Sequence, residues 1–148
     1  MIEKLKEINL HLVIGFALTG MSHALASNFL PEYLKENLIT LLVALLAINT
    51  TTSSVVMTKL KEISDAKGGN FSATIDQLKH SIYEQVIFVV LGAILLTLSG
   101  SKLILELHVW SPFILDGLVA SVFVAALYTL FDTAKSIFVI LRYEDREK

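Results

Sequence analysis

The stretch NLITLLVALLAINTTTSSVVMT, residues 37–58, decides the fold, because it is mostly apolar and contains no Asp, Glu, Lys or Arg. A helix needs about 20 predominantly apolar residues to cross the hydrocarbon core of a bilayer. Backbone N–H and C=O groups find no water in lipid, so a spanning segment forms its hydrogen bonds within itself. We therefore predict that residues 37–58 form a membrane-spanning helix.

Three further runs along the chain have a similar character. Residues 12–30 and 85–101 also lack Asp, Glu, Lys and Arg, whereas residues 112–141 carry a few charges within an apolar sequence. Hydrophobic residues make up 54% of the chain and charged residues 18%, which is more apolar surface than one small core can bury. The sequence therefore predicts an all-α fold, an integral membrane four-helix bundle that forms one domain over residues 1–148. The expected spans cover residues 12–30, 37–58, 82–101 and 112–141.

The composition also argues against several classes of function. The chain contains no cysteine, which excludes disulfides, thiol catalysis and thiolate metal sites. Its four histidines are dispersed without metal-ligand spacing, and no phosphate-binding glycine loop or nucleophile–base set appears. A net charge of −2 offers nucleic acid no electrostatic attraction. We therefore expect no enzyme activity, no cofactor, no metal and no nucleic-acid partner.

Lysine and arginine are unevenly distributed among the connections between the predicted spans. They gather in the N-terminal segment, in residues 59–81 and after residue 141, whereas the other two connections contain only Lys35 and Lys102. Because cytoplasmic loops of membrane proteins carry an excess of Lys and Arg, both termini and residues 59–81 are predicted to be cytoplasmic.

The second and third helices are predicted to extend on the cytoplasmic side. The apolar spacing of the second span continues through residues 59–63 as far as Gly68-Gly69-Asn70, and Thr74 with Gln77 resembles a capping box for the next helix. Residues 59–81 are therefore expected to form a cytoplasmic hairpin. An apolar seam between its two arms is expected to contain Leu60, Ile63, Ile75, Leu78 and Ile82.

The two connections on the outer side of the membrane are expected to be short. Pro31 is expected to end the first span, so residues 31–36 are interpreted as a short turn. Residues 101–111 contain several apolar residues and are expected to form a short amphipathic segment along the interface.

Small residues recur at helical spacing in the first and fourth spans. Such patterns allow helices to approach closely in lipid, where tight packing replaces the hydrophobic drive. Packing within one subunit and packing between subunits both remain open. The residues concerned are Ala17, Gly20, Ala24 and Ser27 in the first span, and Gly117, Ser121 and Ala125 in the fourth.

Residues 49–54, Asn-Thr-Thr-Thr-Ser-Ser, are the most polar stretch inside any predicted span. Six successive residues point all round a helix, so they cannot all face one pore. Hydrogen bonding between helices is the plainer interpretation, because hydroxyl groups commonly join membrane helices. Alternatively Asn49, Thr52 and Ser53, which share a face, line a polar pathway or bind an ion.

Asp116 and Asp132 bracket the fourth span. They are 16 residues apart, which is about 24 Å along a helix, whereas the hydrocarbon core is about 30 Å thick. At least one of them therefore lies near the boundary or inside it. Lys135 is three residues beyond Asp132, so the pair is expected either to form an ion pair or to act as a gate or docking contact.

Two further polar residues lie within or at the edge of the predicted spans. His23 lies in the outer half of the first span and is interpreted as a hydrogen-bonding residue or, alternatively, as a proton relay or ligand. Glu84 enters the third span from the cytoplasmic side and is expected to lie at the interface and pair with a lysine.

The layout as a whole resembles small bacterial membrane proteins of phage-exclusion and defence systems, the RexB-like and KwaA-like proteins. The resemblance covers the whole chain and lies in four spans, short outer turns and a charged cytoplasmic hairpin (Lys59 to Glu62) after a Thr/Ser-bearing span. It matches no motif residue by residue and so assigns no functional site. It implies a multi-pass homo-oligomer of the bacterial inner (plasma) membrane that either permeabilises the membrane or anchors a cytoplasmic partner in antiviral defence.

Three functions therefore compete. The first is a homo-oligomeric scaffold or sensor that docks a cytoplasmic protein through the hairpin and the charged tail, residues 142–148. The second is an ion channel lined by residues 49–54 and Asp132, which would need several subunits because four helices are few to enclose a pore. The third, a small transporter, is least favoured because no span has a proline or a charged residue at mid-depth.

Overall fold

The computed structural model describes the backbone of residues 2–67 and 70–145, and the side chains of residues 6–66, 70–106 and 108–135. Within these residues the chain is all-helical and contains no strand. Its five helices are α1 (Ile2–Ala24), α2 (Phe29–Lys67), α3 (Ser72–Ser99), α4 (Lys102–Leu107) and α5 (Ser111–Asp145).

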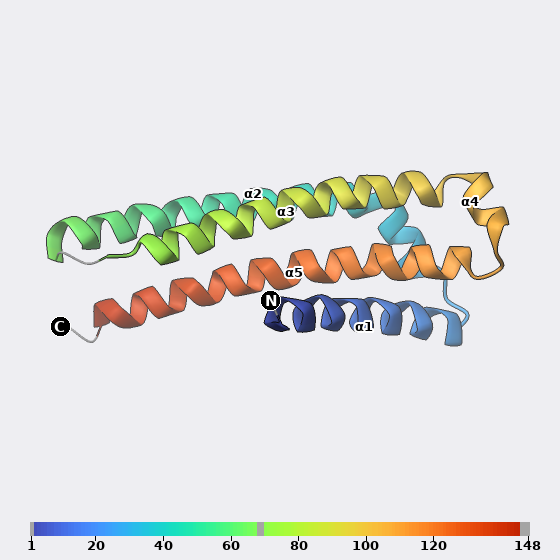
Figure 1. Cartoon of the computed structure of the whole chain (residues 1–148), viewed down its shortest axis with the longest axis horizontal. Helices are drawn as coiled ribbons and strands as arrows, with labels where there is room; N and C mark the ends of the chain where they lie inside the picture. Colours follow the sequence, from blue (N-terminus) through green and yellow to red (C-terminus); the bar gives the residue numbers. More distant parts are fainter. Residues whose placement is uncertain (1, 68–69, 146–148) are drawn as a thin grey trace.

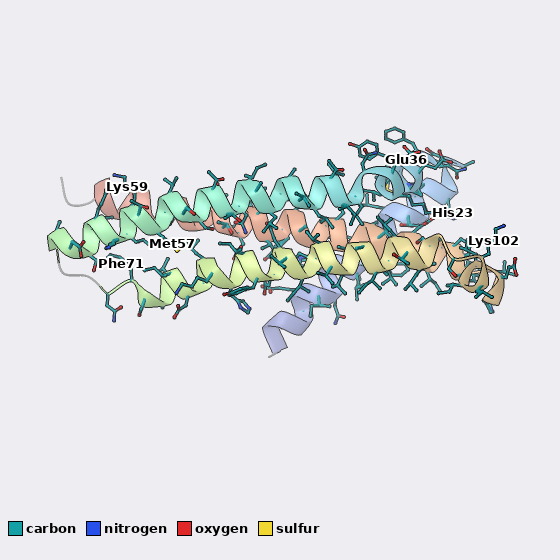
Figure 2. The ribbon with its side chains drawn as sticks, turned by 90° about the horizontal axis from the view of Figure 1, so that it is seen from above. His23, Glu36, Met57, Lys59, Phe71 and Lys102 are labelled. Atoms are coloured by element: carbon teal, nitrogen blue, oxygen red, sulfur yellow. The ribbon has the colours of Figure 1, made fainter. Side chains whose placement is uncertain are left out.

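The long helices α2, α3 and α5 lie side by side, and α1 packs mainly against α5 (Figure 1). The bundle is uneven along its long axis. The N-terminus of α1 lies near the middle of the bundle, whereas α2, α3 and α5 extend from there to the end where the α2–α3 turn lies. Figure 2 places His23, Glu36 and Lys102 at one end of the molecule and Lys59 and Phe71 at the other. We refer to these as the His23 end and the Phe71 end.

Three helices are long and apolar enough to cross a membrane, which indicates a multi-pass membrane protein. Within the described residues they are Phe29–Ala66, Ser72–Ser99 and Ser111–Lys135. α1 is not among the three, because polar and charged residues interrupt it. They include Glu7, Asn9 and His11 in its first half and Thr19, Ser22 and His23 toward its end.

The boundary between the first two helices differs from the expected one. α1 ends at Ala24, and Ala26 adopts a left-handed conformation with φ of 50° that turns the chain. α2 begins at Phe29, so Pro31 lies in its first turn, where a missing N–H breaks no helical hydrogen bond. The predictions that the first span reaches residue 30, that Pro31 ends it, and that residues 31–36 form a turn were therefore wrong.

The main core lies where α2 and α5 face each other. It contains Leu34, Leu38 and Leu42 of α2 and Val119, Ala120 and Ala126 of α5. The alternation of leucines on one helix with small residues on the other lets the two backbones pack closely.

A second apolar cluster, which we call the hairpin cluster, joins α2 and α3 at the Phe71 end. Its buried residues are Val56, Leu60 and Leu78, with Met57, Phe71 and Ile75 packed against them; Met57 lies between the two helices in Figure 2. The predicted seam is confirmed for Leu60, Ile75 and Leu78, whereas Ile63 and Ile82 lie outside the cluster.

The start of α3 also differs from the expected one. α3 begins at Ser72, and Phe71 is its N-cap residue without a side-chain hydrogen bond. The Ser72 N–H instead donates to Asn70 Oδ1 at 3.0 Å. The predicted capping box of Thr74 and Gln77 was therefore wrong, and Asn70 supplies the acceptor that the helix terminus needs.

Candidate functional site

Polar side chains from three helices meet inside the bundle and form what we call the polar belt: Asn49, Ser53, Ser81, Gln85 and Thr133. Asn49 Nδ2 donates to Ser81 Oγ at 2.9 Å, and Ser81 Oγ lies 2.8 Å from Thr133 Oγ1. Asn49 and Ser53 are both 0% exposed. The chain therefore directs both side chains into its own interior, where Asn49 joins α2 to α3 and, through Ser81, to α5.

The belt does not satisfy all of its own polar atoms. Gln85 Nε2 donates to the Ala126 carbonyl at 3.3 Å. Within the described residues, Asn49 Oδ1, Ser53 Oγ and Gln85 Oε1 are buried without a hydrogen-bond partner. Each such atom lowers the free energy of unfolding by about 1–3 kcal/mol unless water reaches it. The polar belt therefore reduces the stability that an apolar core would give at this position.

The sequence analysis found Asn49, Thr52 and Ser53 but missed their partners. Thr52 is only half-buried, so the three do not share one environment. Gln85 was detectable as the single amide in an apolar run, whereas Ser81 and Thr133 carry no signal without the tertiary contact.

The hydrogen bonds of the belt also fix the depth of Asn49. Ser81 lies three residues before Glu84 in α3, and Thr133 follows Asp132 in α5. Asn49 is therefore level with two carboxylates rather than with the middle of an apolar region. The most apolar part of α2 lies between Lys35 and Asn49, and the polar residues 50–54 follow it toward the Phe71 end.

An ion pair between α2 and α5 lies near the other end of the bundle. Lys35 Nζ lies 2.7 Å from Asp116 Oδ1, and the Asp116 side chain is 11% exposed. Asp116 Oδ1 is buried and accepts no hydrogen bond from the described residues, so the contact with Lys35 is an ion pair only. Lys35 was not predicted as the partner, because the two residues are distant in sequence.

Asp132 and Lys135 do not form the expected ion pair. The Lys135 ammonium lies 4.7 Å from the Phe131 ring centroid and 6.0 Å from that of Tyr128. A cation over an aromatic face gains electrostatic stabilisation from the ring. Asp132 instead lines a cavity between helices.

Of the remaining predicted polar residues, His23 contacts another helix and Glu84 contacts a residue of its own helix. His23 is exposed, and its ring packs edge-on against Phe113 of α5 with centroids 5.4 Å apart. Glu84 Oε1 lies 3.3 Å from Nε2 of His80, one turn earlier in α3.

The predicted small residues lie on the packed face of α5, whereas those of α1 do not pack within the chain, which leaves packing between subunits as their open alternative. Gly117, Ser121 and Ala125 are buried as expected. Ala17, Ala24 and Ser27 are exposed, and a Cβ added at Gly20 would meet nothing within 4 Å. The face of α1 that packs on α5 instead carries Gly15, Thr19 and Ser22.

Gly15 marks the closest approach of α1 to α5. A Cβ added there would lie 2.6 Å from Ser121 Cα, closer than real side chains come. Glycine is therefore required at residue 15 by the packing of the backbones. Phe16 covers Gly117 in the same contact.

A polar cavity of about 300 Å³ lies between α1, α3 and α5. The side chains that give it its character are Glu7 of α1, His80 and Glu84 of α3, and Tyr128, Thr129 and Asp132 of α5. His11, which precedes the predicted first span, stacks on Tyr128 with centroids 4.8 Å apart.

An apolar cavity of about 410 Å³ lies between the same three helices. Its wall includes Leu12 of α1, Phe88 and Leu91 of α3, and Leu118 and Val122 of α5. Across the described residues, no group of three His, Asp or Glu side chains is arranged to hold a metal ion.

Comparison with known proteins found no matching family model, no matching curated protein and no matching solved structure. The class of protein therefore rests on the chain itself, whose three long apolar helices indicate a multi-pass membrane protein.

Proposed function

We propose that this chain is a four-span scaffold of the bacterial inner membrane, assembled as a homo-oligomer, whose α2–α3 hairpin docks a cytoplasmic protein. In this arrangement α1 is the fourth span, and both termini and the Phe71 end lie in the cytoplasm. The lysines of residues 59–81 support this orientation. The resemblance in layout to phage-exclusion proteins makes antiviral defence the context that we propose.

The hairpin cluster is the observation that carries the proposal. Leu60 and Leu78 are 1% and 2% exposed, although they lie beyond the polar belt and outside the main core. A helical pair that only connected two spans would need no core of its own. This cluster keeps the two arms together and presents a defined surface.

The outer surface of the hairpin is charged rather than apolar. Lys59 pairs with Glu62 at 2.6 Å and Asp76 with Lys79 at 3.5 Å, and Lys61 and Asp65 are exposed. Such a surface is compatible with exposure to water. It would recognise a partner by charge complementarity, which contributes to the specificity of binding more than to its affinity.

The burial of Asn49 and Ser53 favours the scaffold over an oligomeric pore. Rings of polar side chains that conduct ions must face the conduction path. Both side chains are covered by helices of their own chain, and Asn49 is bonded to Ser81. A path lined by them would require those contacts to break.

Docking can be tested by photo-crosslinking in native cells, with a photoreactive amino acid at Asp65. We expect one discrete adduct with a cytoplasmic protein. Lys61→Glu should abolish that adduct, because it reverses an exposed charge on the same surface. Lys102→Glu is the matched control, since it makes the same change at the His23 end and should leave the adduct intact.

The docking role would be contradicted by adducts that form only between copies of this chain. It would also be contradicted by a cytoplasmic adduct that survives Lys61→Glu as well as it survives Lys102→Glu.

A further inference from the structure

The short helix α4 lies across the ends of α3 and α5, crosswise to the long helices (Figure 1). Backbone hydrogen bonds hold both of its ends. The Leu105 N–H donates to the Ser101 carbonyl at 3.1 Å, where α4 begins. After α4, the Ser111 N–H donates to the His108 carbonyl at 3.0 Å, and the Trp110 N–H donates to His108 Nδ1 at 3.3 Å. The connection between α3 and α5 is therefore a structured crosswise element rather than an open loop.

α4 has a charged face and an exposed apolar residue beside it. Lys102 and Glu106 are four residues apart, so they lie on one face, and both are exposed. Leu103 is turned about 100° from Lys102 around the helix, and it is 81% exposed. Among the described residues, α4 contacts only α3 and α5, against which Ile104 and Leu105 are half-buried. No helix of the described chain therefore covers Leu103.

The exposed apolar surface continues into the turn between α4 and α5. Val109 is 91% exposed and Trp110 is 61% exposed. Trp110 nevertheless has a defined position, because its ring packs edge-on against Phe113 of α5 with centroids 6.2 Å apart. Large apolar side chains that a chain holds in place and leaves uncovered mark a surface that contacts a partner or a membrane.

The two long helices that α4 connects determine its depth. α3 and α5 are each long and apolar enough to cross a membrane, so a short connection between their ends lies at the membrane surface. Ser111, the first residue of α5, precedes Asp116 by five residues, about 8 Å along the helix. The polar layer on each side of the hydrocarbon core is about 5–8 Å thick. If Asp116 and Lys35 mark the edge of the apolar part, α4 lies at the depth of the lipid headgroups.

The turn at the opposite end of the bundle has a different surface. Between residues 59 and 81, none of the described large hydrophobic side chains is exposed, and the outer surface carries the ion pairs Lys59–Glu62 and Asp76–Lys79. That hairpin encloses its apolar residues, as a surface in water requires. α4 and residues 109–110 instead leave theirs uncovered, which is suited to lipid.

We propose that α4 and residues 109–110 bind the phospholipid surface. Leu103, Val109 and Trp110 insert among the upper parts of the acyl chains, while Lys102 and Glu106 are directed toward water. Tryptophan and short amphipathic helices favour this layer, because each combines an apolar body with polar groups. The surface is that of the outer leaflet under the proposed topology. The inference rests on α3 and α5 as spans and not on the docking role of the hairpin.

Fluorescence of the natural protein tests the proposal, because Trp110 is the single tryptophan of the chain. The purified protein is reconstituted into phosphatidylcholine vesicles whose acyl chains carry bromine, a quencher that acts on contact, either near the headgroup or near the chain terminus. We expect bromine near the headgroup to reduce Trp110 emission about twofold, and bromine near the chain terminus to have little effect.

Two double variants separate the apolar anchor from the charged face. Leu103→Gln combined with Val109→Gln should raise the emission in vesicles brominated near the headgroup toward its unquenched value. Lys102→Gln combined with Glu106→Gln is the matched control, since it introduces the same side chain twice on the charged face and also leaves the net charge unchanged. Quenching in this control should equal that of the natural protein.

Emission that neither brominated lipid reduces would overturn the proposal. In that case, emission at the wavelength of water-exposed tryptophan would place Trp110 in water, and emission at shorter wavelength would assign its cover to a second copy of the chain. Quenching that is lost in the charged-face variant but kept in the apolar variant would also contradict an apolar anchor. Quenching of the natural protein decides between lipid, water and protein even if a variant fails to fold.

Discussion

Lys35 and Asp116 show how a single contact can define a boundary of the bundle. Their 2.7 Å contact joins α2 to α5, and Asp116 is well shielded from solvent. A carboxylate in that position would be costly without a counter-charge. Lys35 provides it while remaining 39% exposed, as expected of a long side chain that reaches toward the interface.

A double-mutant cycle on Lys35→Gln and Asp116→Asn should reveal a coupling energy of about 1 kcal/mol, since one partner is shielded and the other partly exposed. Reversible unfolding in mixed micelles measures it. The Lys59–Glu62 pair, exposed on both sides, is the control and should give less than about 0.5 kcal/mol. Equal coupling energies for the two pairs would mean that the Lys35–Asp116 contact stabilises the fold no more than an exposed ion pair does.

The buried position of Asn49 leads to a prediction about stability and ion flux. Replacing Asn49 and Thr52 together by leucine removes the Ser81 hydrogen bond but also an unsatisfied buried oxygen, so unfolding free energy should change by only about 1 kcal/mol. Cation flux into liposomes should be unaffected, because Asn49 is interior. Flux through the unmodified protein that this double variant abolishes would establish the pore in place of the scaffold.

The packing of α1 on α5 belongs to the scale of elements. Gly15→Leu should separate the two helices and lower the unfolding free energy by about 1–3 kcal/mol, because its side chain would meet the Ser121 backbone. Gly20→Leu is the matched control in the same helix, where the added side chain meets nothing in the chain. Thermal unfolding of the two variants in detergent measures the difference.

Gly20→Leu also tests the homo-oligomer. Ala17, Gly20 and Ala24 are small residues on a face of α1 that no other helix of the chain covers. If this face packs on a second copy, Gly20→Leu should weaken assembly while leaving the fold of the single chain intact. Unchanged assembly together with an unchanged fold would place the subunit interface elsewhere.

The sequence predicted the elements better than their faces. Long apolar runs located α2, α3 and α5, because length and apolarity suffice to mark a long membrane helix. The stripes Ala17–Gly20–Ala24 and Gly15–Thr19–Ser22 have similar spacing, and periodicity cannot choose between them without the partner helix. Pro31 was ambiguous for a local reason, since proline both ends helices and begins them.

The polar belt and the Asp116 ion pair bound the apolar part of the whole molecule. Asp116 and Asp132 are separated by 16 residues, about 24 Å along α5, and Lys35 to Asn49 spans about 21 Å along α2. A typical hydrocarbon core is about 30 Å thick. We therefore predict that the protein is most stable in a thin bilayer, or thins the bilayer around it.

Thermal stability in vesicles of phospholipids with increasing chain length should accordingly be highest in the thinner bilayers. Replacing both Lys35 and Asp116 by leucine should move the optimum to thicker bilayers, because the apolar part is then extended at the His23 end. A stability that rises steadily with bilayer thickness for the unmodified protein would contradict the apolar boundaries assigned here.

Accessibility of single introduced cysteines tests most directly whether the chain crosses the membrane four times with a cytoplasmic hairpin. The natural chain has no cysteine, so each label reports one position. The positions are Lys6 in the first turns of α1, Leu25 directly after α1, Asp65 in the hairpin and Lys102 at the start of α4. We predict that a membrane-impermeant maleimide labels Leu25→Cys and Lys102→Cys in intact cells, and Lys6→Cys and Asp65→Cys only after permeabilisation. Labelling of Asp65→Cys in intact cells would contradict the orientation, and labelling of Lys6→Cys and Leu25→Cys from the same side would contradict the fourth span.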